Sequence, residues 1–236
     1  DLGGMSAKGG LFSPEGKMVA KSTVKTCKEE GFAVTAKNLA GLAREVCELA
    51  KVPLSQLGGV GVGTPGIIDG ANGIVVAWTN FDWENVPLAA EMSKNLGGIP
   101  VKISNDANAA ALGEAKFGAG KKFTDSITIT LGTGVGSGII IGGKIFEGFR
   151  GGAGEAGHMT LVVGGIPCTC GRRGCFEQYA SASALIRDTK KAMFEHKDSA
   201  MWKIAPDPEE VNGVTSFTAA KEGDKAAQEV VKNYIM

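Results

Sequence analysis

The stretch LGTGVGSGIIIGGKI, residues 131–145, has the pattern that decides the fold class. It repeats the pattern of LGGMSAKGGLFSPEGKM, residues 2–18: a strand end, a glycine-rich turn, a second strand and a turn closed by Gly-Lys. Short glycine turns between strands expose consecutive backbone N–H groups, and such a nest attracts phosphate. One such hairpin in each half of the chain predicts a duplicated fold with a nucleotide held between two lobes.

Strands and helices alternate around these hairpins. Apolar spacing and breaker residues predict helices over 33–52, 87–96 and 107–117, and strands within 57–67 and over 101–103. The alternation of strands and helices starts again near residue 125 with SITITL. Such a repeated alternation is typical of an α/β protein.

The turn-like, charged segment GAGKKFT, residues 118–124, predicts the boundary between the lobes. We expect a small N-terminal lobe over 1–118 and a large lobe over 119–236. The chain starts at Asp1 without Met, and residues 217–236 keep helical apolar spacing to the last residue. An N-terminal strand and a C-terminal part are therefore expected outside the given sequence.

The composition excludes several classes of partner. The 25 basic and 25 acidic side chains cancel, so no strong field would draw the chain to nucleic acid or to an anionic membrane. Arg172 and Arg173 alone are too few for a nucleic-acid footprint. No apolar run approaches the roughly 20 residues that span a bilayer. The odd number of cysteines, three of them crowded together, indicates a reducing cytoplasm rather than a disulfide framework.

Asp106 has the sequence position of a catalytic base. Asn105 and Asp106 follow the strand over 101–103 and open the helix over 107–117. Ligands bind at the carboxyl ends of strands in open α/β sheets, and a helix N-terminus keeps a carboxylate ionised. The alternative is that Asp106 only caps the helix, which is the commoner role of Asp at this position.

A cluster of metal-binding residue types follows in HMTLVVGGIPCTCGRRGC. His158, Cys168, Cys170 and Cys175 supply one imidazole and three thiolates, a set that suits a closed tetrahedral zinc site. The C-x-C-x4-C spacing departs from the usual C-x2-C ribbon, so free thiols are the alternative.

The segment GGAGEAGH, residues 151–158, places Glu155 and His158 three residues apart. Its glycines favour a loop that presents polar groups, with an ordinary solvated turn as the alternative. Cys27 and Cys47 are expected to be small buried side chains.

These motifs closely resemble the ROK family of repressors, open reading frames and kinases. The matching motifs are DLGG, GTPG (63–66), NDAN (105–108), LGTGVGSG, GEAGH and CTCGRRGCFE, in order along nearly the whole chain. The resemblance implies a two-lobed, actin-like (ribonuclease H-like) ATPase fold with duplicated βββαβα units and a zinc-binding loop. It also implies an ATP-dependent hexose kinase, and TNFDWENVPL, residues 79–88, is most similar to the bacterial glucokinase branch.

The resemblance further implies roles for single residues. Asp106 would accept the proton of the sugar hydroxyl that attacks the γ-phosphorus of ATP. The sugar would be bound by Gly66, Asn105, Asp106, Glu155, His158 and Glu177. The phosphates and Mg²⁺ would be bound by Asp1, Gly4, Met5, Ser6, Lys8, Thr133 and Gly134. Met5 stands where family members usually have Thr, so one hydroxyl contact to phosphate is lost.

Zinc in the family is structural, and the resemblance assigns it to His158, Cys168, Cys170 and Cys175. One ring nitrogen of His158 on the metal leaves the other for the sugar, and Glu177 follows the same Cys loop. Removal of the metal is therefore expected to weaken sugar binding and to spare ATP.

Two other functions remain open at this point. The first is a kinase for N-acetylmannosamine or another hexosamine, and the second is the sugar-sensing body of a ROK transcriptional repressor. A homodimer or higher homo-oligomer is expected in each case.

Overall fold

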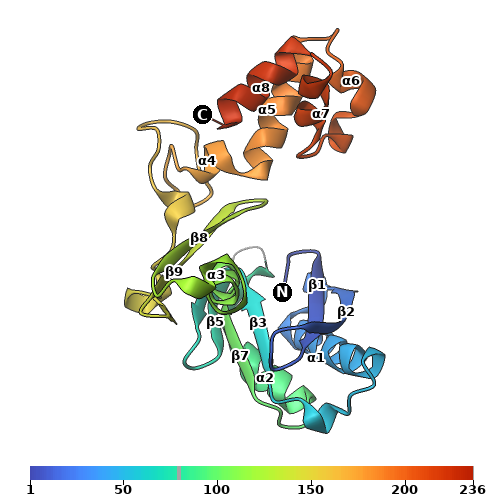
Figure 1. The fold of residues 1–236 in the computed structure, drawn as a ribbon, viewed down its shortest axis with the longest axis vertical. Coiled ribbons are helices and arrows are strands. Elements are labelled where there is room, and N and C mark those ends of the chain that lie inside the picture. The colour runs from blue at the N-terminus through green and yellow to red at the C-terminus, as the bar shows by residue number, and fades with distance from the viewer. Residues whose placement is uncertain (79–80, 236) are drawn as a thin grey trace. The chain divides into compact units, whose positions relative to one another are not determined.

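The computed structural model describes residues 1–78 and 81–235 (Figure 1). Thr79 and Asn80, which open the segment similar to glucokinases, lie outside the described residues. The chain forms two compact units: residues 1–128 with 138–154, and residues 129–137 with 155–236. The predicted division into lobes at residues 118 and 119 stays a prediction.

The first unit begins with an antiparallel hairpin. Strand β1 (Ser6–Phe12) pairs with β2 (Met18–Lys25) in a register that runs from Ser6 opposite Lys25, with a bulge between Leu11 and Phe12. Helix α1 (Phe32–Leu49) packs on both strands through a buried stripe of Leu39, Leu42 and Val46. The predicted helix over 33–52 is confirmed and ends three residues early.

A parallel strand pair forms the centre of this unit. Strand β3 (Val60–Thr64) pairs with β7 (Val101–Asn105), and Thr64 lies opposite Asn105. Helices α2 (Leu88–Asn95) and α3 (Asp106–Phe117) confirm the helices predicted on either side of β7. Because the strands are parallel, the motifs GTPG and NDAN lie at the same edge of the pair.

A three-stranded antiparallel meander, β4 (Ile67–Asp69), β5 (Ile74–Trp78) and β6 (Trp83–Val86), lies between β3 and α2 in the sequence. No sequence pattern predicted this meander. The Trp78 and Phe81 rings stack with centroids 3.7 Å apart, and Trp83 meets both rings edge-on. This aromatic cluster belongs to the core of the unit, together with Val75 and Met92.

The next sheet has the order β10-β9-β8, formed by β8 (Ser126–Leu131), β9 (Val135–Ile141) and β10 (Lys144–Ile145). Gly142 and Gly143 connect β9 to β10 with φ of 58° and 74°, the conformation of a tight hairpin turn. A Cβ at Gly138 would overlap Ala111, because α3 packs directly on the backbone of β9. The hairpin predicted from residues 131–145 is confirmed.

The C-terminal part of the second unit is helical. Its helices are α4 (Glu177–Ala180), α5 (Ala182–Glu195), α6 (Met201–Ile204), α7 (Thr215–Lys221) and α8 (Lys225–Ile235). Leu185, Met193, Met201 and Val230 form their shared core.

The helical spacing predicted within 217–236 is confirmed as far as Ile235, and it is divided between α7 and α8. Gly223, with φ of 93°, follows α7, and the Asp224 carboxylate accepts a hydrogen bond of 2.8 Å from the Ala227 amide to start α8. Within the described ranges, no helix is both long and apolar enough to cross a membrane.

Candidate active site and metal centre

Asn105 and Asp106 occupy the carboxyl edge of the parallel strand pair. Asn105 is the N-cap of α3, and its side-chain oxygen accepts hydrogen bonds from the amides of Ala107 (3.0 Å) and Asn108 (3.3 Å). Asp106 is the first residue of the helix and is exposed. The capping role that was the alternative for Asp106 therefore belongs to Asn105.

The Asp106 carboxylate keeps one oxygen available. Its Oδ1 accepts a hydrogen bond of 2.9 Å from the Ala107 amide, and its Oδ2 has no hydrogen-bond partner among residues 1–78 and 81–235. An exposed carboxylate with a free oxygen can accept a proton from a hydroxyl group placed beside it.

Gly66 forms the other part of this edge. Its φ is 99°, and a Cβ there would overlap the carbonyl oxygen of Ala77 and lie 3.1 Å from the Trp78 Cβ. The Gly66 carbonyl accepts a long hydrogen bond of 3.5 Å from the Asn105 side-chain amide. The aromatic cluster therefore supports the Gly66 turn, and the turn contacts Asn105.

The first glycine-rich turn precedes β1. The Gly3 amide bonds the Ser6 carbonyl at 3.0 Å, and the Thr26 hydroxyl bonds the Gly3 carbonyl at 2.8 Å. The consecutive amides of Gly4 and Met5 have no hydrogen-bond partner in the described part of the chain. Two adjacent free amides at a turn are suited to an anion.

The side chains around this turn are open to solvent. The Met5 side chain is 90% exposed, and Asp1 and Lys8 are also exposed. The Lys8 amide donates to the Asp1 carbonyl at 2.9 Å, so these two residues lie side by side at the base of the turn.

The second glycine-rich turn, between β8 and β9, has a similar arrangement. The Gly132 amide bonds the Gly134 carbonyl at 2.9 Å, while the amides of Thr133 and Gly134 lack partners among the described residues. The next amide, that of Val135, donates to Glu177 Oε2 at 3.0 Å. No sequence signal predicted this contact, because its two residues are 42 positions apart.

His158 and three cysteines converge in the second unit. Their ligand atoms, one from each of His158, Cys168, Cys170 and Cys175, all lie within 4.8 Å of one another. The Cys170 and Cys175 sulfurs are 3.6 Å apart, and the Cys168 sulfur is 3.6 Å from His158 Nδ1. A tetrahedron with Zn–S bonds of about 2.3 Å has edges of roughly 3.8 Å. Both the donor set and its spacing therefore fit zinc.

The thiols of this cluster differ in acidity. Hydrogen bonds from the Arg172 backbone and side chain lower the pKa of Cys170 to about 6, whereas burial raises the pKa of Cys175 to about 11. Metal binding requires thiolates, so Cys175 must lose its proton when a cation enters.

The two cysteines outside the cluster are in different environments. Cys47 is buried as predicted. Cys27 is only half-buried, with a left-handed backbone (φ 53°), so its predicted burial was wrong.

The cysteine loop is shaped by its backbone as well as by its ligands. Gly174 has φ of 77°, and a Cβ there would overlap the Val162 carbonyl oxygen. The Tyr179 hydroxyl accepts a hydrogen bond of 3.0 Å from the Ile166 amide. The loop conformation therefore depends on glycine at 174 and on an anchor from α4.

The two ring nitrogens of His158 face different groups. Nδ1 faces the Cys168 sulfur, and Nε2 lies 3.9 Å from Glu155 Oε2. Ala156 lies between Glu155 and His158 in the sequence, and its amide donates a hydrogen bond of 3.2 Å to the Ser137 hydroxyl. This contact with β9 was not predicted from the sequence. A metal on Nδ1 would thus leave Nε2 on the side of Glu155.

The predicted site residues fall into two sets. The first unit contains Asp1, Gly4, Met5, Ser6, Lys8, Gly66, Asn105 and Asp106. The second unit contains Thr133, Gly134, Glu155, His158, Cys168, Cys170, Cys175 and Glu177. Within each unit the predicted residues gather as described above, and their combination into one site is a proposal.

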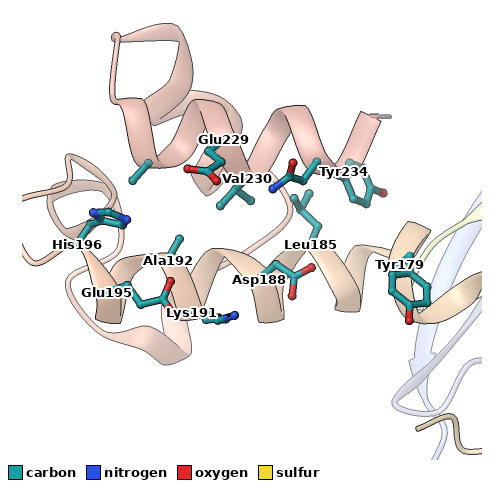
Figure 2. A pocket seen from close by; sticks show the side chains of 12 residues that line it. Tyr179, Leu185, Asp188, Lys191, Ala192, Glu195, His196, Glu229, Val230 and Tyr234 are labelled. Carbon is teal, nitrogen blue, oxygen red and sulfur yellow. Dashed lines mark ion pairs between the residues drawn. The ribbon is translucent and has the colours of Figure 1, made fainter. Parts of the chain in front are cut away.

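A cavity of about 460 Å³ lies between α5 and α8 (Figure 2). Leu185, Ala192 and Val230 line it together with charged side chains such as Asp188 and Glu229. None of the predicted site residues, all of which the structure describes, contributes to this lining. The cavity is therefore separate from the candidate active site.

The chain is similar to known proteins in both sequence and structure. The family match is to the ROK family and covers residues 1–236. Glucokinase from Thermotoga maritima is 40% identical over 228 residues, which are 96% of this chain and 70% of that protein.

Two solved structures represent the enzymes and the regulators of the family. A ROK family glucokinase from Streptomyces griseus, in complex with glucose and AMPPNP, has a TM-score of 0.83 at 34% identity, over 99% of this chain and 73% of that one. A ROK family transcriptional regulator, a homolog of the E. coli MLC protein, has a TM-score of 0.81 at 26% identity, over 99% of this chain and 57% of that one.

Proposed function

The chain belongs to the ROK family, and we propose that it catalyses transfer of the γ-phosphoryl group of ATP to the 6-hydroxyl of glucose. The predicted family and the predicted actin-like α/β fold are confirmed by the match over residues 1–236 and by the TM-score of 0.83 to a ROK glucokinase. The predicted sugar kinase, nearest to the glucokinase branch, is supported by the 40% identity to a bacterial glucokinase.

One observation carries the proposed chemistry. Asp106 presents an exposed carboxylate oxygen at the carboxyl edge of a parallel strand pair, while Asn105 takes over the capping of α3. We assign Asp106 as the base that accepts the proton of the attacking sugar hydroxyl. Phosphoryl transfer depends mainly on positioning and on charge stabilisation, so one well-placed base is enough.

We propose that the sugar hydroxyls are bound by residues of both units. Gly66 and Asn105 would contribute from the first unit, and Glu155, His158 and Glu177 from the second. The amide and carboxylate groups of this set can donate to and accept from neighbouring sugar hydroxyls. Support comes from the contacts of Asn105 with Gly66 and of His158 with Glu155.

The phosphates of ATP are assigned to the two glycine-rich turns. Gly4, Met5 and Ser6 in the first turn, and Thr133 and Gly134 in the second, would bind through backbone amides, with Lys8 nearby. The free amides of both turns support this assignment. Mg²⁺ would accompany the phosphates, and Asp1 is the acidic residue proposed beside it.

Zinc would have a structural role in this enzyme. We propose that it is held by His158, Cys168, Cys170 and Cys175, where it would fix the loop that precedes Glu177. The bound metal would also fix the ring of His158, so that Nε2 faces the sugar.

Two finer proposals accompany this function. Assembly as a homodimer or higher homo-oligomer is proposed from the family resemblance alone. A cytoplasmic location is proposed because all the cysteines are unpaired, as expected in a reducing compartment.

A ROK repressor body is the second candidate, because the similarity to a transcriptional regulator extends over 99% of this chain. An assay of ATP consumption by the full-length protein tests the enzyme against it. The assay uses glucose, N-acetylmannosamine, N-acetylglucosamine, mannose and fructose. Glucose is expected to give the highest kcat/KM; preference for a hexosamine would reassign the substrate, and no turnover with any sugar would favour the repressor.

A further inference from the structure

We propose that Glu177 positions the phosphate-binding turn between β8 and β9, in addition to the role at the sugar expected from the motifs. The inference rests on the proposed function, because the turn matters only if it holds ATP. The geometry that supports it comes entirely from residues of the second unit.

The first observation is the hydrogen bond between Glu177 and the turn. Val135 opens β9 directly after Thr133 and Gly134, and its amide donates to Glu177 Oε2 at 3.0 Å. The two preceding amides stay without partners among the described residues and can face a phosphate. Glu177 Oε1 also has no partner in that part of the chain, so it remains available for a sugar hydroxyl.

The second observation is the close approach of the carboxylate to the turn. A Cβ at Gly134 would overlap Glu177 Oε2 and lie 3.2 Å from its carboxyl carbon. The Glu177 carboxylate therefore lies directly against the backbone of the turn. Glycine at 134 is required as long as Glu177 keeps this position.

The third observation is a second link on the other side of the turn. The Ala182 amide, in the first turn of α5, donates to the Gly132 carbonyl at 2.8 Å. This start of α5 is itself fixed, because buried Ser181 caps the helix by accepting from the Ala184 amide at 3.1 Å. The segment from α4 to α5 thus holds both ends of the turn, through Gly132 and through Val135.

These contacts connect the metal loop to the nucleotide. Cys175 lies two residues before Glu177, and the Phe176 amide between them bonds the Met159 carbonyl at 2.8 Å. A shift of the cysteine loop would therefore move Glu177 and, through it, the phosphate turn. This proposal therefore differs from the expectation that metal removal spares ATP binding, and it predicts that both ligands bind more weakly.

The test uses calorimetry on the full-length protein. It measures the Kd of AMPPNP without sugar and the Kd of glucose without nucleotide, along with zinc content and Tm. Glu177→Ala is expected to weaken AMPPNP binding about tenfold, because the turn loses a charge-assisted hydrogen bond. Glu177→Gln keeps an acceptor oxygen and should stay within about threefold of the wild-type Kd.

Glu155→Ala is the matched comparison. Glu155 is a carboxylate of the same unit, assigned to the sugar, and its Oε2 lies 3.9 Å from His158 Nε2. This variant should weaken glucose binding and leave the AMPPNP Kd within about twofold.

Gly134→Ala provides an independent route, because it substitutes neither Glu177 nor any residue of the cysteine loop. Its Cβ would displace the carboxylate and should weaken AMPPNP binding to a similar extent. In the Glu177→Ala background the same change should have little further effect, since the overlap is gone. If Glu177→Ala loses zinc or stability, the AMPPNP Kd of the Gly134→Ala single variant decides the matter instead.

Two results would overturn the inference. One is an AMPPNP Kd within about twofold of wild type for Glu177→Ala with zinc retained; the other is full additivity of the two substitutions. If the enzyme still phosphorylates glucose, either result excludes the positioning role of Glu177 and leaves the proposed function intact. A wild-type protein that phosphorylates no sugar defeats the proposed function itself.

Discussion

Replacement of Asp106 by Asn separates the catalytic role of this carboxylate from its structural one. Asn keeps an oxygen that can accept the Ala107 amide, which now bonds Asp106 Oδ1 at 2.9 Å. What is lost is one negative charge in the first turn of α3, worth about 0.3–1 kcal/mol at an exposed position. The free energy of unfolding should therefore fall by no more than about 1 kcal/mol.

The effect on catalysis should be much larger. An amide can still hydrogen-bond the sugar but cannot accept its proton, so kcat is expected to fall at least about 100-fold, equivalent to roughly 2.7 kcal/mol. Glucose affinity should stay close to wild type. The measurements are a coupled ATP-consumption assay, calorimetry with glucose and thermal unfolding of the full-length protein.

Glu114→Gln is the control for charge loss on the same helix. Glu114 lies near the other end of α3, is exposed, and accepts a hydrogen bond of 2.9 Å from the Ala119 amide that Gln can also accept. Its kcat should equal that of wild type. If Asp106→Asn keeps more than about a tenth of wild-type kcat, Asp106 is not the base.

Three further predictions concern the metal and the two ligands. Elemental analysis should find about one zinc per chain, and Cys170→Ser should lose both metal and thermal stability; a metal-free protein of unchanged activity would exclude the site. Gly66→Ala should lower the free energy of unfolding by about 1–3 kcal/mol, because the φ of Gly66 is 99° and the new Cβ would overlap the Ala77 carbonyl oxygen. The same substitution should raise KM for glucose more than KM for ATP. Equal changes in the two KM values would contradict a role of Gly66 at the sugar. Met5→Thr should lower KM for ATP severalfold, because the new hydroxyl would add one hydrogen bond to phosphate, worth about 0.5–1.5 kcal/mol. Tm should not change, because the Met5 side chain is 90% exposed. An unchanged KM for ATP would mean that the backbone alone binds phosphate at this turn.

Local sequence signals were enough to predict the elements that carry the first part of the site. The strand over 101–103 and the helix after it put Asn105 and Asp106 at a sheet edge, and β7 and α3 confirm both elements. The choice between these residues as N-cap was not predictable, because Asn and Asp cap helices about equally well. The structure resolves it through the bonds of Asn105 to two amides of α3.

Contacts between distant residues were beyond the reach of the sequence patterns. The meander β4 to β6 has strands of three to five residues, too short for alternation to be distinctive. The bond from Val135 to Glu177 joins residues 42 apart and depends on how α4 leaves the cysteine loop. The roles assigned to these site residues stay predictions until the variants are measured.

The parallel pairing of β3 with β7 also has a consequence for folding kinetics. The paired residues are separated by about 40 positions, and a parallel pair gains its hydrogen bonds only after the loop between them has closed. GTPG and NDAN come together only when this non-local step is complete. Until then the apolar strand Val60–Thr64 lacks its partner, which exposes an unpaired edge to other chains. Nascent chains should therefore be most prone to aggregation before residues 101–105 emerge from the ribosome and reach β3.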